Sequence, residues 1–323
     1  MIGMQIWQVY LIFLLRRMQS GNDTRENSMS AHFETSPLKD SFGVTVHNFD
    51  LSKISMERDY PELRKLFENH SALLFHNQSL EPENHLRLAQ MFGPIEDRKK
   101  DERQPGDVPE VSFVSNETDA GVSGEMDLHT LHLKANQQWH IDSTFMPIPS
   151  LCNILAAKVV TTEGGQTELA STRAAWAAMP EDLRQRIKGR ILGHNYRRSR
   201  ERISMELANL PMFNKWPAQR WPAVWANPVN GQEALFIASH VFEVEGLSPT
   251  EGDALVDELI AYCTRPQFVY SHQWQVGDVL MWDQRATLHR GMPWPYEQPR
   301  TLASVCCSMT GADGLDAARK LVG

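Results

Sequence analysis

Residues 137–149 read QQWHIDSTFMPIP, and this stretch decides how the rest of the chain is interpreted. It contains a His-x-Asp pair, His140 and Asp142. On a β-strand, residues i and i+2 face the same side, so both side chains can point at one metal ion. A His-x-Asp pair also occurs by chance, so its meaning depends on what the rest of the chain offers.

A third metal ligand is offered by His289, which lies in the segment LMWDQRATLHRG (280–291). Two imidazoles and one carboxylate on one face leave coordination positions vacant, which is the arrangement that iron(II) oxygenases use. A closed structural zinc site has four protein ligands, commonly including cysteine, and no cysteine neighbours these residues in sequence. The residues therefore predict an Fe(II) site formed by His140, Asp142 and His289.

The composition narrows the class of protein. The chain has 323 residues, of which 41% are hydrophobic, so it is long enough for one large domain with its own core. Its net charge of −8 argues against nucleic acid as the main partner, because nucleic-acid-binding proteins usually carry a basic face. The four cysteines form neither a disulfide framework nor a C-x-x-C zinc motif, which favours a reducing, cytoplasmic location.

The first 32 residues differ from the rest. Residues 1–17 (MIGMQIWQVYLIFLLRR) contain an apolar run that is shorter than the roughly 20 residues a membrane span needs. They also lack the basic start and cleavage site of a secretory signal. We expect an N-terminal extension over 1–32, either disordered or an over-extended gene start, with a membrane-surface anchor as the alternative. Neither interpretation predicts stable membrane insertion.

The remaining pattern predicts a mainly β fold with helical decoration. Apolar strand candidates cover 151–160, 235–238, 268–274 and 279–282, and helical patterns cover 82–92 and 173–179. Ser248 and Glu251 form a capping box ahead of a further helix. Many short strands with few helices indicate a β core. We expect one domain over 33–312, a lid over 195–230 that is too long for a bare connector, and a tail over 313–323.

Several further segments resemble the taurine dioxygenase/2,4-dichlorophenoxyacetate dioxygenase (TauD/TfdA) family, and their order and spacing match those of the family. The resemblance extends from about Phe42 to Met309 and includes Arg300, which lies 11 residues beyond His289. The matching segments are FGPIE (92–96), WHIDSTF (139–145), EGGQTELASTRAAW (163–176), LFIASH (235–240) and VGDVLMWDQRATLHRG (276–291).

The resemblance implies a double-stranded β-helix (jelly-roll) core and an Fe(II) enzyme with 2-oxoglutarate and O2 as co-substrates. It maps the residues that hold the distal carboxylate of 2-oxoglutarate onto Thr167 and Arg300. A guanidinium suits that role because it can donate two charge-assisted hydrogen bonds to a carboxylate. The expected reaction hydroxylates a small organic acid and releases succinate and CO2.

The resemblance also bears on the substrate. In the taurine and phenoxyacetate branches a second arginine grips the substrate anion, and its position, fifteen residues beyond His289, is Ser304 here. The amino-acid sequences of the segments resemble the phenoxyalkanoate branch more than the taurine branch, so an aryloxyalkanoate-like acid is the expected substrate class. Asn116, Trp139 and Trp282 are candidate pocket residues, and the basic stretch RRSRER (197–202) either faces solvent or attracts an anionic substrate.

Two other functions stay in view at this point. One is a biosynthetic hydroxylase or desaturase built on the same iron core. The other is a barrel that binds ligands without catalysis. The partner we expect is a small-molecule organic acid, with no nucleic acid and with homo-oligomer formation left open.

Overall fold

The computed structural model describes residues 33–98, 109–118, 121–122 and 128–323. The N-terminal extension expected over 1–32 thus lies outside the described residues. Among the described residues, no helix is both long enough and apolar enough to cross a bilayer.

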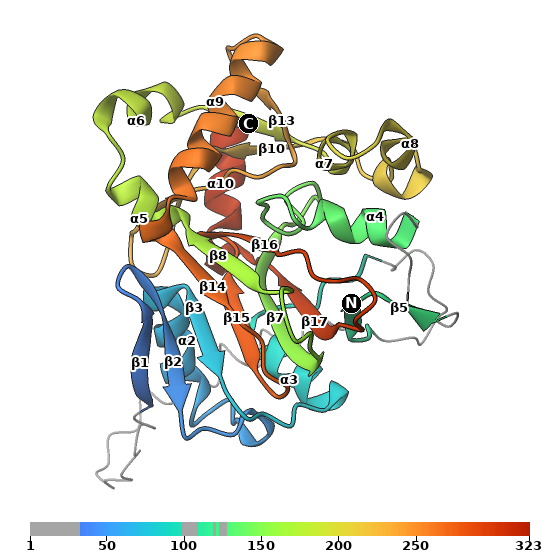
Figure 1. Ribbon diagram of the computed structural model, residues 1–323. Coiled ribbons are helices and arrows are strands. Elements are labelled where there is room, and N and C mark those ends of the chain that lie inside the picture. The colour runs from blue at the N-terminus through green and yellow to red at the C-terminus, as the bar shows by residue number, and fades with distance from the viewer. Residues whose placement is uncertain (1–32, 99–108, 119–120, 123–127) are drawn as a thin grey trace, which may run out of the picture. The chain divides into compact units, whose positions relative to one another are not determined.

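The largest sheet has seven strands in the order β1-β2-β3-β15-β7-β17-β4 (Figure 1). Its neighbouring strands are antiparallel except for the pair β2 and β3. Strands buried on both faces read as nearly continuous apolar runs, which is how the central strands appear in sequence. The strands are β1 Glu34–Lys39, β2 Phe42–His47, β3 Ala72–Phe75, β4 Ser112–Ser115, β7 Ser150–Val159, β15 Val279–Asp283 and β17 Thr301–Ser308.

The two faces of this sheet bury different clusters, because successive side chains of a strand point to opposite faces. From β3, Leu73 and Phe75 pack in the cluster that includes helices α2 (Tyr60–His70) and α3 (Pro82–Phe92). Ala72 and Leu74 of the same strand belong to a second cluster. The central strands are therefore covered on both sides.

The second cluster joins the large sheet to a smaller one with the strand order β14-β8-β16. Leu169 of the small sheet is fully buried in this cluster, together with Leu280 and Trp282 of β15. The small sheet consists of β8 Thr167–Ser171, β14 Val269–His272 and β16 Thr287–Gly291. Its strand β16 positions the candidate metal ligand His289.

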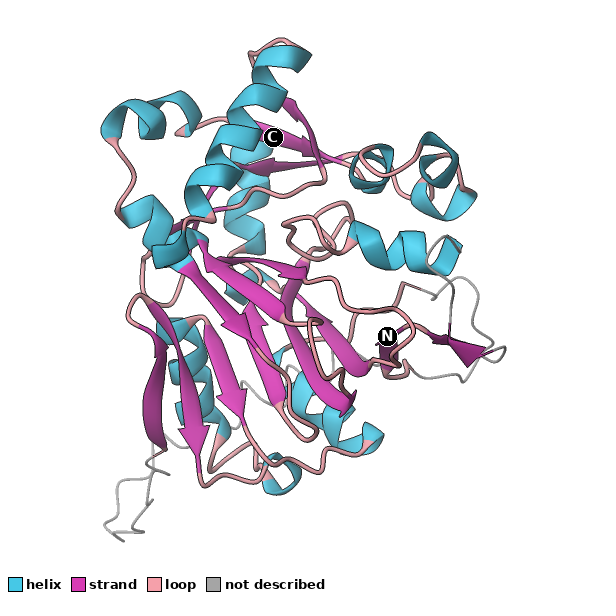
Figure 2. Cartoon of the chain, in the orientation of Figure 1, coloured by secondary structure: helices cyan, strands magenta, loops and turns pink. Residues whose placement is uncertain are grey.

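Helices flank the strands rather than separating them (Figure 2). The longest is α9, Pro249–Cys263, and it begins with the predicted capping box of Ser248 and Glu251. The helix expected over 82–92 is α3, and the one expected over 173–179 is α5, Thr172–Ala177. The coarse prediction of a mainly β chain with helices is confirmed.

Residues 195–230, expected as a lid, contain ordered elements of their own. They are α7 Tyr196–Glu201, α8 Met205–Ala208, η3 Pro211–Phe213, β10 Gln219–Pro222 and β11 Val224–Ala226. The residues expected as a tail include helix α10, Leu315–Val322, whose Leu315 and Ala318 are buried in the main core. The two residues between them, Asp316 and Ala317, are exposed.

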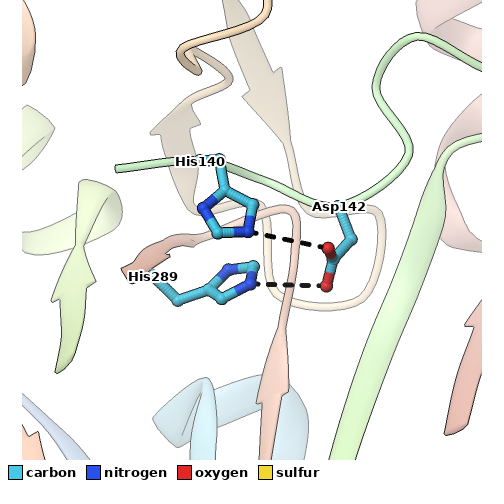
Figure 3. Close-up of side chains that lie close together, drawn as sticks. All are labelled: His140, Asp142 and His289. Carbon is cyan, nitrogen blue, oxygen red and sulfur yellow. Dashed lines mark ion pairs between the residues drawn. The ribbon is translucent and has the colours of Figure 1, made fainter. Parts of the chain in front are cut away.

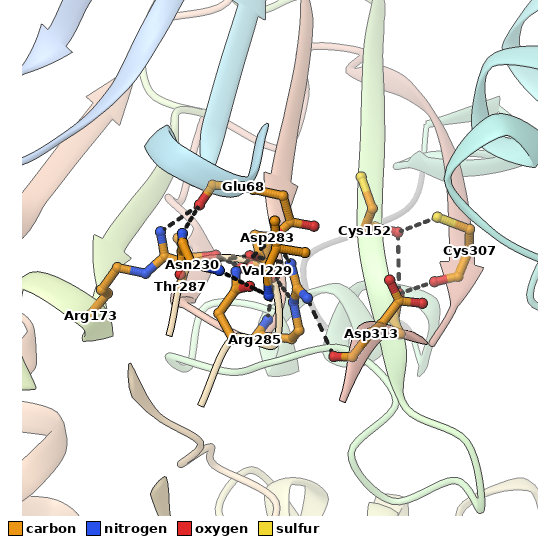
Figure 4. Close-up of polar contacts among 12 residues, drawn as sticks. Glu68, Cys152, Arg173, Val229, Asn230, Asp283, Arg285, Thr287, Cys307 and Asp313 are labelled. Atoms are coloured by element: carbon orange, nitrogen blue, oxygen red, sulfur yellow. Dashed lines mark hydrogen bonds and ion pairs between the residues drawn. The ribbon is translucent and has the colours of Figure 1, made fainter. Parts of the chain in front are cut away.

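A network of buried ions lies where α2, β15 and the C-terminal segment meet (Figure 4). Arg285 is 1% exposed and donates to Glu68 at 2.6 Å and to both oxygens of Asp283 at 2.9 Å. Arg173 adds a hydrogen bond to the backbone carbonyl of Glu68 at 2.8 Å. Each buried charge in this network has a partner of opposite sign, so the pair of Asp283 and Arg285 is a structural feature.

We predict that Arg285→Met lowers the free energy of unfolding by about 3–5 kcal/mol, because it removes the nearest cation of the buried Asp283 and one of the two cations that pair with the buried Glu68. Arg186→Met is the matched control, since Arg186 pairs with Glu258 at 2.8 Å where both side chains are half exposed. That exposed pair should contribute less than about 1 kcal/mol. Urea unfolding followed by tryptophan fluorescence measures both, and equal losses in the two variants would contradict the prediction.

Candidate metal centre

Two backbone hydrogen bonds bring His140 and His289 side by side. The two residues form an isolated antiparallel bridge, in which the amide of each donates to the carbonyl of the other at 3.0 and 2.9 Å. Because directly opposed residues of such a bridge project to the same face, the imidazoles lie together, with ring centroids 4.0 Å apart. Residues separated by 149 positions in sequence thus become neighbours.

Asp142 completes the group (Figure 3). Its Oδ1 lies 3.8 Å from His140 Nε2, and its Oδ2 lies 3.4 Å from His289 Nε2. One ligand atom from each of the three residues lies within 4.8 Å of the others. The sequence analysis grouped these three residues, and the structure brings them together.

The local backbone differs from the strand that the His-x-Asp spacing predicted. Only His140 pairs in a β-bridge, and Asp142 begins a turn. Ser143 follows with φ of +60°, a left-handed conformation that non-glycine residues adopt rarely. The turn carries the carboxylate back toward both imidazoles, so a single bridge and a tight bend achieve what we had assigned to strand alternation.

Buried amides fix the orientation of the Asp142 carboxylate. Gln284 Nε2 and Asn153 Nδ2 donate to its Oδ2 at 2.7 and 2.9 Å, and the Asp142 amide donates to Gln284 Oε1 at 3.1 Å. Ser304 Oγ donates to Asn153 Oδ1 at 3.1 Å and so orients the asparagine. These supporting residues occupy one carboxylate oxygen and leave Oδ1 without an amide donor.

The protonation states suit a divalent cation. Burial lowers the pKa of His289 to about 3, and burial also lowers the pKa of His140 even though Asp142 favours its charged form. Burial disfavours ionisation of Asp142, but the two imidazoles and Arg98 hold its pKa well below the ordinary value. His140 Nδ1 lies 2.7 Å from the carbonyl of Gln138, so Nδ1 carries the proton and Nε2 is free to bind metal.

This donor set fits Fe(II). Neutral imidazoles and a carboxylate are ligands that iron accepts, and three protein ligands leave room for co-substrates. Among the described residues, the group contains no fourth histidine, cysteine or carboxylate, as a closed zinc site would require.

Comparison with known proteins decides the family. A sequence profile described as "Taurine catabolism dioxygenase TauD, TfdA family" matches residues 34–306. The chain belongs to the TauD/TfdA family.

The family relatives include enzymes that are similar over nearly their whole length. The 2,4-dichlorophenoxyacetate dioxygenase of Cupriavidus pinatubonensis, which depends on alpha-ketoglutarate, is 33% identical over 82% of this chain and 94% of its own. The (S)-phenoxypropionate/alpha-ketoglutarate dioxygenase of Sphingobium herbicidovorans is 29% identical over 85% and 94%. The crystal structure of AAD-2 with Mn(II) and N-oxalylglycine is 28% identical, has a TM-score of 0.79, and covers 86% of this chain and 98% of AAD-2.

Arg300 is predicted to bind the distal carboxylate of 2-oxoglutarate. It is a buried cation without a carboxylate partner among the described residues. Its Nε and Nη2 donate to the Gly165 carbonyl at 3.0 and 2.8 Å, and its guanidinium stacks on Trp294 at 4.9 Å. Gly165 has φ of +68°, and a Cβ there would lie 3.0 Å from Arg300 Nε, so only glycine permits this approach. Burial lowers the pKa of Arg300 to about 10, and the group stays charged at neutral pH.

Thr167, the other predicted 2-oxoglutarate residue, lies on β8 beside the strand of His289. In the antiparallel pairing of β8 with β16, Leu169 lies opposite His289 and Thr167 lies opposite Gly291. Thr167 is therefore two residues from the one that faces His289. Its Oγ1 accepts a hydrogen bond from Trp274 Nε1 at 3.0 Å, which fixes the hydroxyl. The hydroxyl therefore has its own proton to donate elsewhere.

The three candidate pocket residues have different surroundings. Asn116 donates to the carbonyls of Tyr296 and Gln298 and accepts from the Arg300 amide, so its side chain anchors the backbone that precedes Arg300. Trp282 is fully buried with its ring centroid 4.8 Å from that of His289. Trp139 is half-buried, and Arg290 lies over its ring at 4.6 Å.

Sequence reasoning missed the residues that support Asp142. Gln284 stands inside the quoted segment 280–291, five residues before His289, but an amide there carries no signal of its own role. Asn153 lies in an apolar strand between Cys152 and Ile154, and that unusual position for a polar residue was the available signal.

We predict that Gln284→Met weakens Mn(II) or Fe(II) binding by roughly 10- to 100-fold, because it removes the two hydrogen bonds that Gln284 makes with Asp142 while conserving volume. Gln273→Met is the control, since Gln273 is exposed and its side chain accepts a hydrogen bond from Gln166, away from Asp142. Anaerobic titration calorimetry on folded protein measures both affinities. Unchanged metal affinity in Gln284→Met would show that the carboxylate is held by other contacts.

Proposed function

We propose that this protein is an Fe(II)- and 2-oxoglutarate-dependent dioxygenase that hydroxylates a small organic acid and releases succinate and CO2. His140, Asp142 and His289 hold the metal. The observation that carries this proposal is the convergence of these three ligand atoms within 4.8 Å at one end of a buried bridge. AAD-2, which is similar over 98% of its length, binds Mn(II) together with an analogue of 2-oxoglutarate.

Arg300 and Thr167 bind the distal carboxylate of 2-oxoglutarate. The buried guanidinium supplies a positive charge that no described carboxylate neutralises, and the Thr167 hydroxyl adds a donor from the neighbouring strand. Asn116 and Gly165 hold Arg300 in place through its backbone and its guanidinium. A charge-assisted contact of this kind gives the co-substrate both affinity and a fixed orientation.

Ferrous iron, when bound with 2-oxoglutarate and O2, supplies the oxidising chemistry that hydroxylates a C–H bond. The chain's own residues orient the reactants and exclude water: Trp282 seals one side of His289, and Gln284 and Asn153 keep the Asp142 carboxylate directed at the metal. A carboxylate ligand at this position also favours hydroxylation, since family halogenases have a small residue there.

The substrate class that we propose is an aryloxyalkanoate-like acid, in line with the relatives that act on 2,4-dichlorophenoxyacetate and (S)-phenoxypropionate. A biosynthetic oxidation is the second candidate. It is favoured by a pentalenolactone F synthase from Streptomyces avermitilis that is 25% identical over 82% of this chain. A barrel that binds ligands without catalysis is less well supported, since the relatives that are similar over nearly their whole length are named as dioxygenases.

We also propose a detailed architecture, a cellular location and a class of partners. The two packed sheets form a double-stranded β-helix with the metal at one end, residues 33–312 are the catalytic domain, and 195–230 are its lid. A cytoplasmic location accords with four free cysteines. The partners are small molecules rather than nucleic acid, and a homo-oligomer is compatible with this arrangement.

Asp142→Ala should abolish the release of succinate from 2-oxoglutarate in the presence of Fe(II) and ascorbate, because it removes the only anionic ligand of the group. Asp257→Ala is the control, since Asp257 is 59% exposed and pairs with Arg202 on the surface. Succinate formation and oxygen uptake measure the result. Full turnover in Asp142→Ala would refute the ligand assignment.

Arg300→Gln should raise the apparent KM for 2-oxoglutarate by roughly 10- to 100-fold, which is what loss of a charge-assisted hydrogen-bond pair predicts. Arg220→Gln, which alters an exposed ion pair with Glu245, serves as the control. Steady-state kinetics with varied 2-oxoglutarate measure both variants. A KM equal to that of the unmodified enzyme would remove Arg300 from the co-substrate site.

A further inference from the structure

The basic stretch 197–202 lies on helix α7 and at its C-terminal cap, and it contains four arginines. Three of these arginines have carboxylate partners. Arg197 pairs with Glu201 at 2.7 Å, Arg198 pairs with Asp253 at 2.7 Å, and Arg202 pairs with Asp257 at 3.0 Å. The expectation of a solvated basic face therefore holds for these three. Arg200 is different, because it is only 4% exposed.

Arg200 lies between two aromatic rings. Its guanidinium carbon is 4.2 Å from the ring centroid of Tyr196 and 4.9 Å from that of Phe213. Nη1 donates to Ser199 Oγ at 2.7 Å, and Nη2 donates to Tyr196 Oη at 3.2 Å. Its Nε is buried without an acceptor, and no described carboxylate pairs with it.

Short contacts connect Arg200 to the metal ligands. Tyr196 stacks on Phe145 with centroids 3.8 Å apart and an interplanar angle of 9°, and Phe145 lies three residues beyond Asp142. The His240 ring contacts that of Tyr196 at 5.9 Å and that of His140 at 6.2 Å. Along this path, two rings, those of Tyr196 and His240, lie between the Arg200 guanidinium and the imidazole of His140.

Backbone contacts hold the same arrangement. Gln138 Nε2 donates to the Ser199 carbonyl at 2.6 Å, and the Gln138 carbonyl accepts from His140 Nδ1. One residue thus bonds both to the helix that carries Arg200 and to a metal ligand. The position of Arg200 relative to the site is fixed rather than left to a flexible loop.

The position at which family members carry a second arginine offers no charge here. Ser304 occupies it, and its hydroxyl is committed to Asn153. Arg98 also lies near Asp142, since it donates a hydrogen bond at 2.9 Å to Oγ of the adjacent Ser143. Its charge is already neutralised by Glu96 at 2.5 Å. Among these candidates, Arg200 is the cation without a counter-ion.

A buried charge without a partner is costly, and an incoming anion offsets that cost. Burial lowers the pKa of the Arg200 guanidinium, and the positive charge of Arg98 adds to this lowering, whereas Tyr196 and, to a smaller extent, Asp142 oppose it. The surrounding rings favour an apolar or ring-bearing molecule whose anionic end reaches the guanidinium.

We propose that Arg200 binds the carboxylate of the organic-acid substrate, and so replaces the arginine that Ser304 has displaced in this chain. The proposal rests on the proposed function of the iron site, whose co-substrate carboxylate is bound separately by Arg300. Tyr196 and Phe213 hold the guanidinium from its two faces. Arg200 is thereby the residue that selects acids over neutral analogues.

The test compares phenoxyacetate with its uncharged analogue phenoxyacetamide, using protein loaded with Mn(II) and N-oxalylglycine so that no turnover occurs. Calorimetry gives a Kd for each compound with unmodified protein, Arg200→Gln, Arg200→Lys and the control Arg198→Gln, whose guanidinium already pairs with Asp253. We expect Arg200→Gln to weaken phenoxyacetate by about 10- to 100-fold and to remove most of the preference for acid over amide. Arg200→Lys should restore part of that preference, and Arg198→Gln should keep all of it.

Three results would overturn the proposal. If Arg200→Gln weakens acid and amide equally, Arg200 is a structural cation between two rings. If phenyl sulfate binds the unmodified protein more tightly than phenoxyacetate does, the site is not built for a carboxylate. If no acid of a phenoxyalkanoate series binds the unmodified protein, the substrate class is wrong. Succinate formation by the unmodified enzyme with 2-oxoglutarate tests the iron chemistry independently of all three.

Discussion

The pair of hydrogen bonds between the backbones of His140 and His289 is the constraint on which the rest of the site depends. It joins a loop that follows helix α4 (Leu128–Ala135) to strand β16 at a single residue on each side. Without this bridge nothing in the local backbone would hold the two imidazoles side by side, since they belong to different elements. The turn at Ser143 then needs only to bring one carboxylate back toward a face that the bridge has already defined.

Buried charges separate into two kinds in this molecule, and the distinction is informative. Arg285 is surrounded by Glu68 and Asp283 and holds helix and sheet together, so its role is complete without a ligand. Arg300 and Arg200 are as deeply buried, yet their described acceptors are carbonyl or hydroxyl oxygens. We infer that a buried cation with no carboxylate partner among the described residues marks an anion site, and we propose Arg300 for the acid co-substrate and Arg200 for the acid substrate.

The sequence alone predicted the grouping of His140, Asp142 and His289, the mainly β architecture and the capped helix α9, because each has a local signature. Spacing of His140 and Asp142, a run of apolar residues over β7, and the Ser248–Glu251 box are all readable from neighbours in the chain. The support of Asp142 by Asn153 and Gln284, and the inward direction of Arg200, depend on contacts between distant segments. Nothing in RRSRER distinguishes the buried Arg200 from the three arginines that are at least partly exposed, until its packing against Tyr196 and Phe213 is known.

The central claim is that His140, Asp142 and His289 bind one ferrous ion together. A crystal structure of the protein with Mn(II) and N-oxalylglycine, with the metal located by its anomalous signal, tests this most directly. The account predicts one metal ion per chain, within bonding distance of both Nε2 atoms and of the Asp142 carboxylate, with N-oxalylglycine extending toward Arg300. A metal ion bound elsewhere, or bound without one of these three residues, would contradict it.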